Sequence, residues 1–448
     1  MGIAFEASTA TVISNFDYPL VFRTIVLMAI CAWATLLSHK NISNFNDGAR
    51  PVFPEFMEGR MTRPEFAAVV TGMGVGWVLA GFTQWIGTGL IAVHLTLIAT
   101  DIIGAWSPNK YVALGLGAAY GALCALGTNL INVAFNALPY NFLNDLTQIT
   151  SPVLPLFSLY PAVAIAGQFS AKKGIITAVW EAIVYVVCSI VGKLTIGSVS
   201  ISLFPYSFAM LTGMIFLIAY SVKASKTTES VETDAEEENI FTKNAERIKS
   251  NWIFLCTQGA LNALGIKILA QAYQPYVLSP AVASGDYSGF YIAMIGVIIA
   301  FIPLIVSTAL ATGVYSSVGL TSCMLFGALA PTWWLAPIFG FAAEFVEIQL
   351  LGLLGKYLSK FPELSKSGDH IRDGMSTTLT LAITAGSFLA ANATWGGIGM
   401  MIVGGAYVLN DMTGERIPKN AVGPLSAAVV GILYNIMIVC GFVVLVAK

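Results

Sequence analysis

Charged residues are scarce in this sequence. Asp, Glu, Lys and Arg make up 10% of the 448 residues, whereas about 25% is usual in a soluble domain. Hydrophobic residues make up 56% of the chain. A soluble core of this size could not hide so much apolar surface, but a bilayer can, because each crossing helix needs about 20 apolar residues. The composition therefore predicts an all-α, polytopic transmembrane helix bundle.

The signatures of common nucleotide and metal sites are also missing. The sequence contains neither the G-x-x-x-x-G-K-[ST] motif that holds ATP phosphates nor the H-E-x-x-H zinc motif. Its six cysteines stand singly, without a C-x-x-C pair, which argues against structural zinc and a disulfide framework. The net charge is −2, so no basic surface for nucleic acid is expected. We therefore expect no cofactor, no metal, no nucleic-acid partner and no enzymatic activity.

Long hydrophobic runs predict about 12–14 membrane segments. Three of the fourteen runs are suspect as full spans: 151–168 carries three prolines, and 316–332 and 396–410 are short. We expect such segments to form broken or re-entrant helices. The complete set is 19–38, 65–87, 88–105, 110–137, 151–168, 174–192, 201–222, 252–272, 288–312, 316–332, 336–356, 375–393, 396–410 and 421–446.

Basic residues between these runs predict the orientation of the chain. Lys and Arg accumulate on cytoplasmic loops of membrane proteins. With all fourteen runs spanning, the basic segments fall on one side: 39–64, 169–173, 223–250, 356–372 and 411–420. We therefore expect a multi-pass protein of the bacterial cytoplasmic (inner) membrane, with its N-terminus outside.

A charged segment divides the chain into two halves. Residues 221–250 carry seven acidic and five basic residues and are expected to form a cytoplasmic linker with a short surface helix. The predicted division is 1–220, 221–250 and 251–448. Gly121–Gly127 resembles Gly259–Gly265, but such Gly, Ala and Leu patterns also match by chance. Whether the halves are repeats, and whether parallel or inverted, stays open.

Charged side chains at membrane depth are costly and by default functional. Charged residues inside apolar runs include Asp101, Glu181, Lys267, Glu344 and Glu347. We predict that Asp101, Lys267 or Glu347 supplies charge for the substrate or its coupling ion. Glu344 and Glu347 are three apart and share a helix face, which suits a proton or Na⁺ site. The alternative is a paired structural or interfacial charge, and His94 is expected to be a hydrogen-bonded core histidine.

Helix breakers at membrane depth point to a substrate site. An interrupted helix exposes backbone groups that lipid cannot satisfy, so it is tolerated where it lines a cavity or lies inside protein. Two such places combine proline with hydroxyls, one around Ser151 and Pro152 and the other following Pro303. A proline kink without function is the alternative. The predicted substrate-binding residues are Ser151, Pro152, Thr308, Thr312 and Gly313, together with Asn129 and Asn132, which share one helix face with Asn136.

These residues resemble a known family. The loop from His39 to Arg63, with Asn46-Asp47-Gly48-Ala49-Arg50-Pro51, is similar to the opening of the YhfT family of bacterial inner-membrane proteins. Further similar strings are Thr100–Gly104, Ser151-Pro152-Val153, Pro303–Ile305, Thr308–Tyr315, Gly355-Lys356 and Asp369–Ser387. Asp101 and Glu347 fall on positions of that family, whereas Glu181, Glu344 and His94 do not. The resemblance implies an uncharacterised protein with a presumed transport role, and it supplies no substrate.

Taken together, the sequence predicts a secondary-type transporter for a small polar solute. We expect it to be a homodimer in contact with membrane lipids, coupled to H⁺ or Na⁺, with an elevator-like movement. Three alternatives stay open, one of which is a scaffold or receptor subunit. A membrane-embedded enzyme acting on a lipid-linked substrate would use the polar residues of the 39–64 and 356–374 loops, and a channel would show flux that does not saturate.

Overall fold

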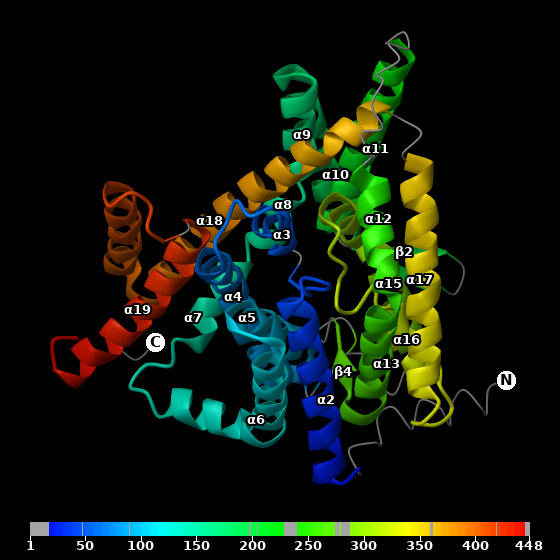
Figure 1. The fold of residues 1–448 in the computed structure, drawn as a ribbon. Coiled ribbons are helices and arrows are strands. Elements are labelled where there is room, and N and C mark those ends of the chain that lie inside the picture. The colour runs from blue at the N-terminus through cyan, green and yellow to red at the C-terminus, as the bar shows by residue number, and fades with distance from the viewer. Residues whose placement is uncertain are drawn as a thin grey trace.

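The computed structural model describes residues 18–46, 48–88, 90–196, 199–203, 205–227, 240–273, 278, 287–358, 362–417 and 419–443. Most of these residues are helical (Figure 1). Seven helices among them are long and apolar enough to contain a membrane crossing: α2 (Leu20–His39), α10 (Ala171–Val191), α11 (Pro205–Thr227), α13 (Trp252–Leu269), α17 (Ala336–Leu358), α18 (Pro362–Met412) and α19 (Lys419–Val439). The prediction of an all-α polytopic membrane bundle is confirmed.

The other elements are shorter or carry more polar residues. The helices are η2 (Arg50–Val52), α3 (Phe53–Met57), α4 (Arg63–Thr88), η3 (His94–Ile98), α5 (Ala99–Trp106), α6 (Lys110–Asn136), α7 (Leu143–Thr147), η4 (Gln148–Thr150), α8 (Val153–Phe157), α9 (Tyr160–Gln168), α12 (Ile240–Ser250), α15 (Tyr287–Thr312) and α16 (Ser322–Leu329). The strands are β1 (Ile91–Ala92), β2 (Lys193–Ile196), β3 (Val199–Ser202) and β4 (Gln271–Ala272). Strand β1 pairs in parallel with β4, and β2 and β3 form an antiparallel hairpin.

Local sequence explains where several helices begin and end. Helix α10 begins after Ser170, whose hydroxyl accepts a hydrogen bond from the backbone N–H of Lys173, because helix starts need such acceptors. It ends at Gly192, whose φ of 66° suits glycine. Helix α18 is sharply kinked at Trp395 and Gly396. Its two arms correspond to the separate runs predicted at 375–393 and 396–410.

The predicted interruptions are partly confirmed and partly displaced. The 151–168 run is broken into α8 and α9, as expected, and 316–332 contains only the half-length helix α16. The break predicted within 302–313 is wrong, because α15 is continuous to Thr312 and ends there. A proline removes one helical hydrogen bond but does not always end a helix. Gly313, with φ of 68°, ends it instead.

The same order of elements occurs twice in the chain. Helices α2, α4, α5 and α6 are followed later by α13, α15, α16 and α17, and α2 packs on α5 and α6 as α13 packs on α16 and α17. Short strings recur at matching places. Thr88-Gly89-Leu90 matches Thr312-Gly313-Val314 after the second helix, and Gly104-Ala105-x-x-Pro108 matches Gly327-Ala328-x-x-Pro331 after the half-helix. The Gly121 and Gly259 strings do not correspond in this arrangement, because they lie in α6 and α13.

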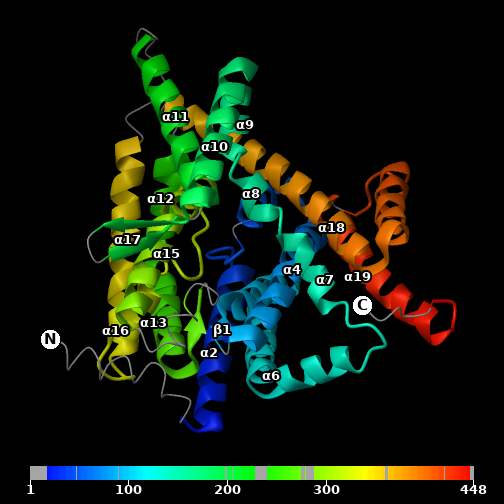
Figure 2. The same ribbon diagram turned by 180° about the vertical axis from the view of Figure 1, so that it is seen from behind.

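The two repeats run in opposite directions. The C-terminal part of α2 meets the N-terminal part of α13, where Trp33 donates a hydrogen bond to the carbonyl of Phe254 and stacks on its ring. Further along, Ile30 of α2 lies against Gly265, near the end of α13. Figures 1 and 2 show the two helices side by side and antiparallel. The repeat is therefore inverted.

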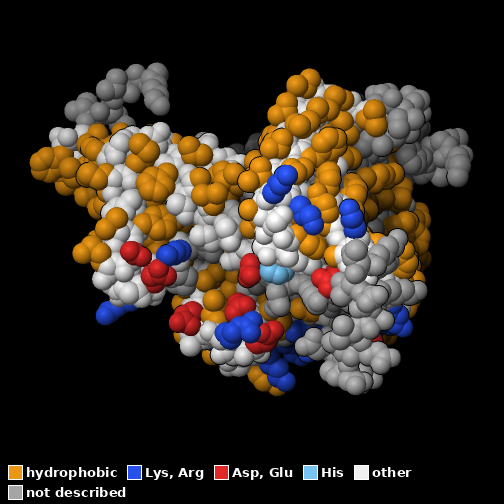
Figure 3. Space-filling model, turned by 90° about the horizontal axis from the view of Figure 1, so that it is seen from above, with side chains coloured by type: hydrophobic (Ala, Val, Ile, Leu, Met, Phe, Trp, Pro, Cys, Tyr) orange, Lys and Arg blue, Asp and Glu red, His pale blue; other side chains and the backbone are white. Residues whose placement is uncertain are grey.

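The ends of the helices next to several basic segments lie together. Helix α3, the turn between α9 and α10, the end of α17 and the start of α18 all lie in the upper part of Figure 1. Viewed from above, this face carries Lys, Arg, Asp and Glu side chains among hydrophobic ones (Figure 3). This arrangement agrees with the prediction that the basic segments share one side.

Candidate functional site

The two repeats meet where their helices are interrupted. Strand β1 lies between α4 and the half-helix formed by η3 and α5, and it pairs with β4 at the end of α13. The backbone N–H of Ile91 donates to the carbonyl of Ala270 at 3.2 Å. The equivalent pairing joins Tyr315 with Ser43, where the N–H of Tyr315 donates to the carbonyl of Ile42 at 3.4 Å. We call these two pairings the crossing.

Buried amide side chains surround the crossing. Asn44 is fully buried, and neither its amide oxygen nor its amide nitrogen has a hydrogen-bond partner among the described residues. Gln271 donates to the hydroxyl of Thr96 at 2.8 Å, but its own oxygen lacks a partner within the same part of the chain. Buried polar groups are normally satisfied. The crossing therefore offers donors and acceptors to a polar ligand.

Aromatic rings form one wall of the crossing. His94, at the start of the half-helix, stacks on Trp77 with ring centroids 5.3 Å apart. Phe45 meets His94 edge to face at 5.2 Å, and the ring of Tyr273 lies 5.7 Å away. The predicted core position of His94 is confirmed by its burial, although its Nδ1 has no hydrogen-bond partner among the described residues.

A fully buried arginine lies next to the crossing. Arg50 has electrostatic contacts with Asp101 and with the tyrosines at 160, 273 and 315. Tyr160 begins α9, which belongs to the interruption predicted around Ser151 and Pro152. The structure therefore brings the two predicted broken regions together through Tyr160 and Tyr315.

Asp101 fixes the loop that supplies Asn44. Its Oδ2 accepts hydrogen bonds from the backbone N–H groups of Phe45 and Asn46, both at 2.9 Å. The side chain is fully buried on α5. Hydrogen bonds from backbone N–H groups to a carboxylate are stronger than those between neutral groups, so Asp101 positions the loop against the half-helix.

Glu347 has the corresponding place at the start of α16. It accepts from the hydroxyl of Tyr315 at 2.8 Å and from the backbone N–H of Leu320 at 2.7 Å, and it also accepts from the hydroxyl of Ser322. A carboxylate at a helix N-terminus satisfies free donors and complements the helix dipole. Glu347 therefore holds the second half-helix in place.

Glu344 lies one turn earlier on the same helix, α17. Both carboxylates converge on Gly319, where an added Cβ would lie 2.3 Å from Glu347 Oε2 and 2.6 Å from Glu344 Oε2. Unlike Glu347, Glu344 keeps one buried oxygen, Oε2, without a hydrogen-bond partner in the described parts of the chain. Gln258 of the adjoining helix α13 is also buried, and its side-chain oxygen Oε1 likewise has no hydrogen-bond partner among the described residues.

Lys267 is held by the other end of α16. Its ammonium donates to the carbonyls of Ala330 at 2.7 Å and Ala328 at 3.3 Å. These carbonyls lie at the helix C-terminus, where a cation is favourable. Glu181 of α10, by contrast, makes no hydrogen bond to the half-helices within the described parts of the chain, and its carboxylate lies against Gly213 of α11.

The threonine hydroxyls that were predicted to bind substrate donate hydrogen bonds to backbone carbonyls of their own helix, α15. Thr308 donates to Ile305 at 3.2 Å, and Thr312 donates to the carbonyl of Thr308 at 2.6 Å. Thr312 and Gly313 lead directly into the crossing. Ser151 is exposed and follows η4, which packs on α18; Pro152 lies next to it. The side chains of Asn129 and Asn132 lie outside the described residues.

A small cavity lies beside the crossing, next to Tyr273. This cavity of about 10 Å³ is bordered by Tyr273, Thr321 and Met324, among others, and such a volume holds about one water molecule. The described residues contain no group of three His, Cys, Asp or Glu residues placed to hold a metal ion.

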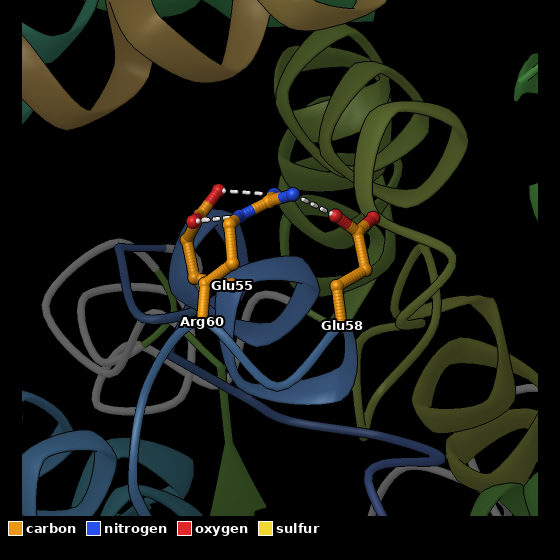
Figure 4. Close-up of polar contacts among 3 residues, drawn as sticks. All are labelled: Glu55, Glu58 and Arg60. Atoms are coloured by element: carbon orange, nitrogen blue, oxygen red, sulfur yellow. Dashed lines mark hydrogen bonds and ion pairs between the residues drawn. The ribbon is translucent and has the colours of Figure 1, made fainter.

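The polar loop before α4 carries a separate surface cluster. Arg60 bonds to Glu55 through two nitrogen–oxygen contacts of 2.6 and 2.8 Å and also pairs with Glu58 (Figure 4). These carboxylates raise the pKa of Arg60. All three side chains are roughly half exposed. Exposed ion pairs contribute little to stability, so this cluster closes the turn after α3 and does not extend the site.

The fold and the crossing define a class, a polytopic all-α membrane protein built from two inverted repeats. The comparisons with known proteins place it more narrowly. The chain belongs to the YhfT family, whose model, described as a protein of unknown function, matches residues 23–443. It is 30% identical over 431 residues to "Uncharacterized protein YhfT" of Escherichia coli (strain K12). The matched region covers 93% of this chain and 98% of the relative. No solved structure matches.

Proposed function

We propose that the protein is a secondary-type transporter that binds a small polar solute at the crossing. The observation that carries this proposal is Asn44, an amide buried between two interrupted helices with no partner among the described residues for either polar atom. Non-helical backbone at membrane depth is tolerated where it lines a pathway or lies in protein. Transporters with inverted repeats bind their substrates between discontinuous helices.

The crossing favours solutes with several hydrogen-bonding groups. Asn44 and Gln271 supply amides, and the wall of Trp77, His94 and Tyr273 can cover an apolar face. Such a combination suits sugars, nucleosides and amino acids, which present both kinds of surface. The cavity of about 10 Å³ next to Tyr273 is too small for such a solute, and we expect one repeat to move relative to the other during transport, as in an elevator or rocking mechanism.

A ligand screen tests the proposed site. Purified protein is heated with sugars, amino acids, nucleosides and carboxylates, and stabilisation by one chemical class is expected. Asn44→Ala should remove that stabilisation, whereas Ser151→Ala, at an exposed position outside the crossing, should keep it. If both variants respond like the parent protein, the solute binds elsewhere.

Flux measurements then separate a transporter from a channel. Uptake of the identified solute into proteoliposomes should saturate with its concentration and should fall in Asn44→Ala. A linear, unsaturated flux would support a channel instead. Chemical conversion of a lipid-linked compound by the purified protein would support the enzyme alternative.

We further propose that Glu344 binds the coupling proton. The carboxylates of Asp101 and Glu347 serve several donors, but Glu344 Oε2 and Gln258 Oε1 are buried acceptors without donors among the described residues. A proton on Glu344 would convert an acceptor into a donor. The groups near Glu344 are Glu347, Cys256, Cys323 and Tyr315. The family resemblance does not include Glu344, so this proposal concerns this chain.

Substituting Glu344 tests the coupling. Glu344→Gln should bind the solute normally but lose the acceleration of uptake by a pH gradient. Acceleration of the parent protein by a Na⁺ gradient alone would contradict proton coupling. An unchanged pH response in Glu344→Gln would assign the proton to another residue.

The remaining expectations concern location and assembly. A bacterial cytoplasmic membrane agrees with the apolar helices and with the shared side of several basic segments, and we propose it. A homodimer is a separate proposal. Fractionation of cells that express a tagged chain tests the first. The mass of the particle in nanodiscs tests the second, because a dimer has twice the mass of one chain.

A further inference from the structure

A second cavity lies away from the crossing, between the linker helix α12 and the end of α17. Its volume is about 210 Å³, and its lining includes Thr242, Glu246, Lys249, Gln349 and Lys356. Helix α12 buries Phe241, Ala245 and Ile248 against the bundle. The charged side of this amphipathic helix therefore forms one wall of the cavity.

The lining has the chemistry of a phosphate site. Two lysines border the space and one acidic residue, Glu246, partly offsets their charge. The Oγ1 of Thr242 is buried without a hydrogen-bond partner among the described residues, so it can donate to an anion. Gln349 adds an amide. Lysine ammonium groups bind phosphate as point charges.

The surroundings of the cavity favour a lipid over a free anion. Leu353, which also borders it, is 64% exposed, and Leu350 and Tyr357 on the same helix are 59% and 58% exposed. Helix α17 is long and apolar enough to cross a membrane, so these side chains face lipid. Tyrosine is frequent at the membrane surface, and the basic segments 223–250 and 356–372 belong to the predicted cytoplasmic side.

We propose that this cavity binds the phosphate headgroup of an anionic phospholipid of the inner leaflet. Lys249 and Lys356 hold the phosphate from the two helices, and the acyl chains lie along the exposed leucines of α17. Basic pockets beside membrane helices on the cytoplasmic side recognise such headgroups. The bound lipid would join the linker helix to α17, and the proposal does not depend on the nature of the transported solute.

Lipid retention measured by native mass spectrometry tests this assignment. Protein in detergent is titrated with phosphatidylglycerol or, separately, with phosphatidylcholine. Preferential retention of phosphatidylglycerol is expected, and it should fall about fivefold for each lysine lost in Lys249→Ala and Lys356→Ala. The matched control is Lys243→Ala, on the same helix but outside the lining, which should retain the lipid.

Further experiments distinguish loss of lipid binding from misfolding, and a lipid headgroup from free phosphate. Lys249→Arg and Lys356→Arg should restore retention if charge is what matters, and unchanged circular dichroism shows that the alanine variants are folded. Competition by excess inorganic phosphate would assign the cavity to a soluble anion and overturn the lipid proposal. Equal retention by Lys243→Ala and the two lining variants would also overturn it.

Discussion

The two half-helices share a framework but are held by carboxylates in different ways. On the first, Asp101 lies within α5 and binds the backbone of the loop that follows α2, at Phe45 and Asn46. On the second, the carboxylate comes from the next helix, where Glu347 of α17 binds the start of α16 at Leu320 and Ser322. The repeats thus preserve backbone geometry while the residues that stabilise it have diverged.

This difference explains why the sequence does not show the repeat clearly. Only short strings at the turns are shared, such as Thr-Gly followed by an aliphatic residue. At Gly313 the φ of 68° favours glycine. The carboxylate whose hydrogen bonds hold each half-helix can come from any nearby element. Substitutions at the two ties should therefore have distinct effects.

The largest effect is expected at Asp101. Asp101→Ala should lower the free energy of unfolding by about 4 kcal/mol, because two buried backbone N–H groups and the nearby Arg50 lose their carboxylate. Asp101→Asn keeps one oxygen for the N–H groups and should lose less. Thermal melting in detergent measures both. Equal melting temperatures for Asp101→Ala and the parent protein would contradict a structural tie.

A somewhat smaller effect is expected at Glu347. Glu347→Ala should lower stability by about 3 kcal/mol, because the start of α16 loses its acceptor. Hydrogen exchange should increase in residues 315–329 and stay unchanged in residues 94–106. Faster exchange in both half-helices would show that the two ties are not independent.

Glycine at the break should matter less. Gly313→Ala should cost about 2 kcal/mol, since φ is 68° and the new Cβ would lie 2.7 Å from Asn244 Oδ1. Gly115→Ala, at a helical position with open space around it, provides the control. Melting temperatures that fall equally in both variants would contradict this account.

The smallest effect is expected on the surface. Arg60→Ala should leave the melting temperature unchanged within error, because its pairs with Glu55 and Glu58 are exposed and screened by solvent. A clear drop that disappears in high salt would show that this cluster contributes more than expected.

The sequence predicts the class of fold and several of its interruptions, but not the crossing. Apolar runs identify the membrane helices, and the prolines near Ser151 correctly indicate a break. Pro303 misleads, because a long helix can tolerate one missing hydrogen bond. Asn44 was missed because it lies in the loop after the 19–38 run, and Gln271 because it lies at the end of the 252–272 run. The pairing of Ile91 with Gln271 joins distant backbone segments and has no periodic signal.

The recurrence of the Thr-Gly and Gly-Ala-x-x-Pro strings could have located the crossing. Each string alone is common in membrane helices, but their order is the same in both halves and their spacing differs by one residue. The roles of Asp101, Lys267 and Glu347 could not be read from their burial alone. A buried charge is consistent with both a ligand site and a structural tie, and only the positions of its partners decide between them.

The antiparallel arrangement of α2 and α13 has a consequence for direction. Two opposed copies of one motif give the molecule no built-in preference for either face of the membrane, so any preference must come from features that only one copy has. Helix α12 is such a feature, because Asn244 binds the carbonyl of Leu310 near the end of α15. Arg247 of the same helix reaches the carbonyl of Asn41 in the opposite copy. Helix α12 thereby breaks the symmetry of the two copies from one side.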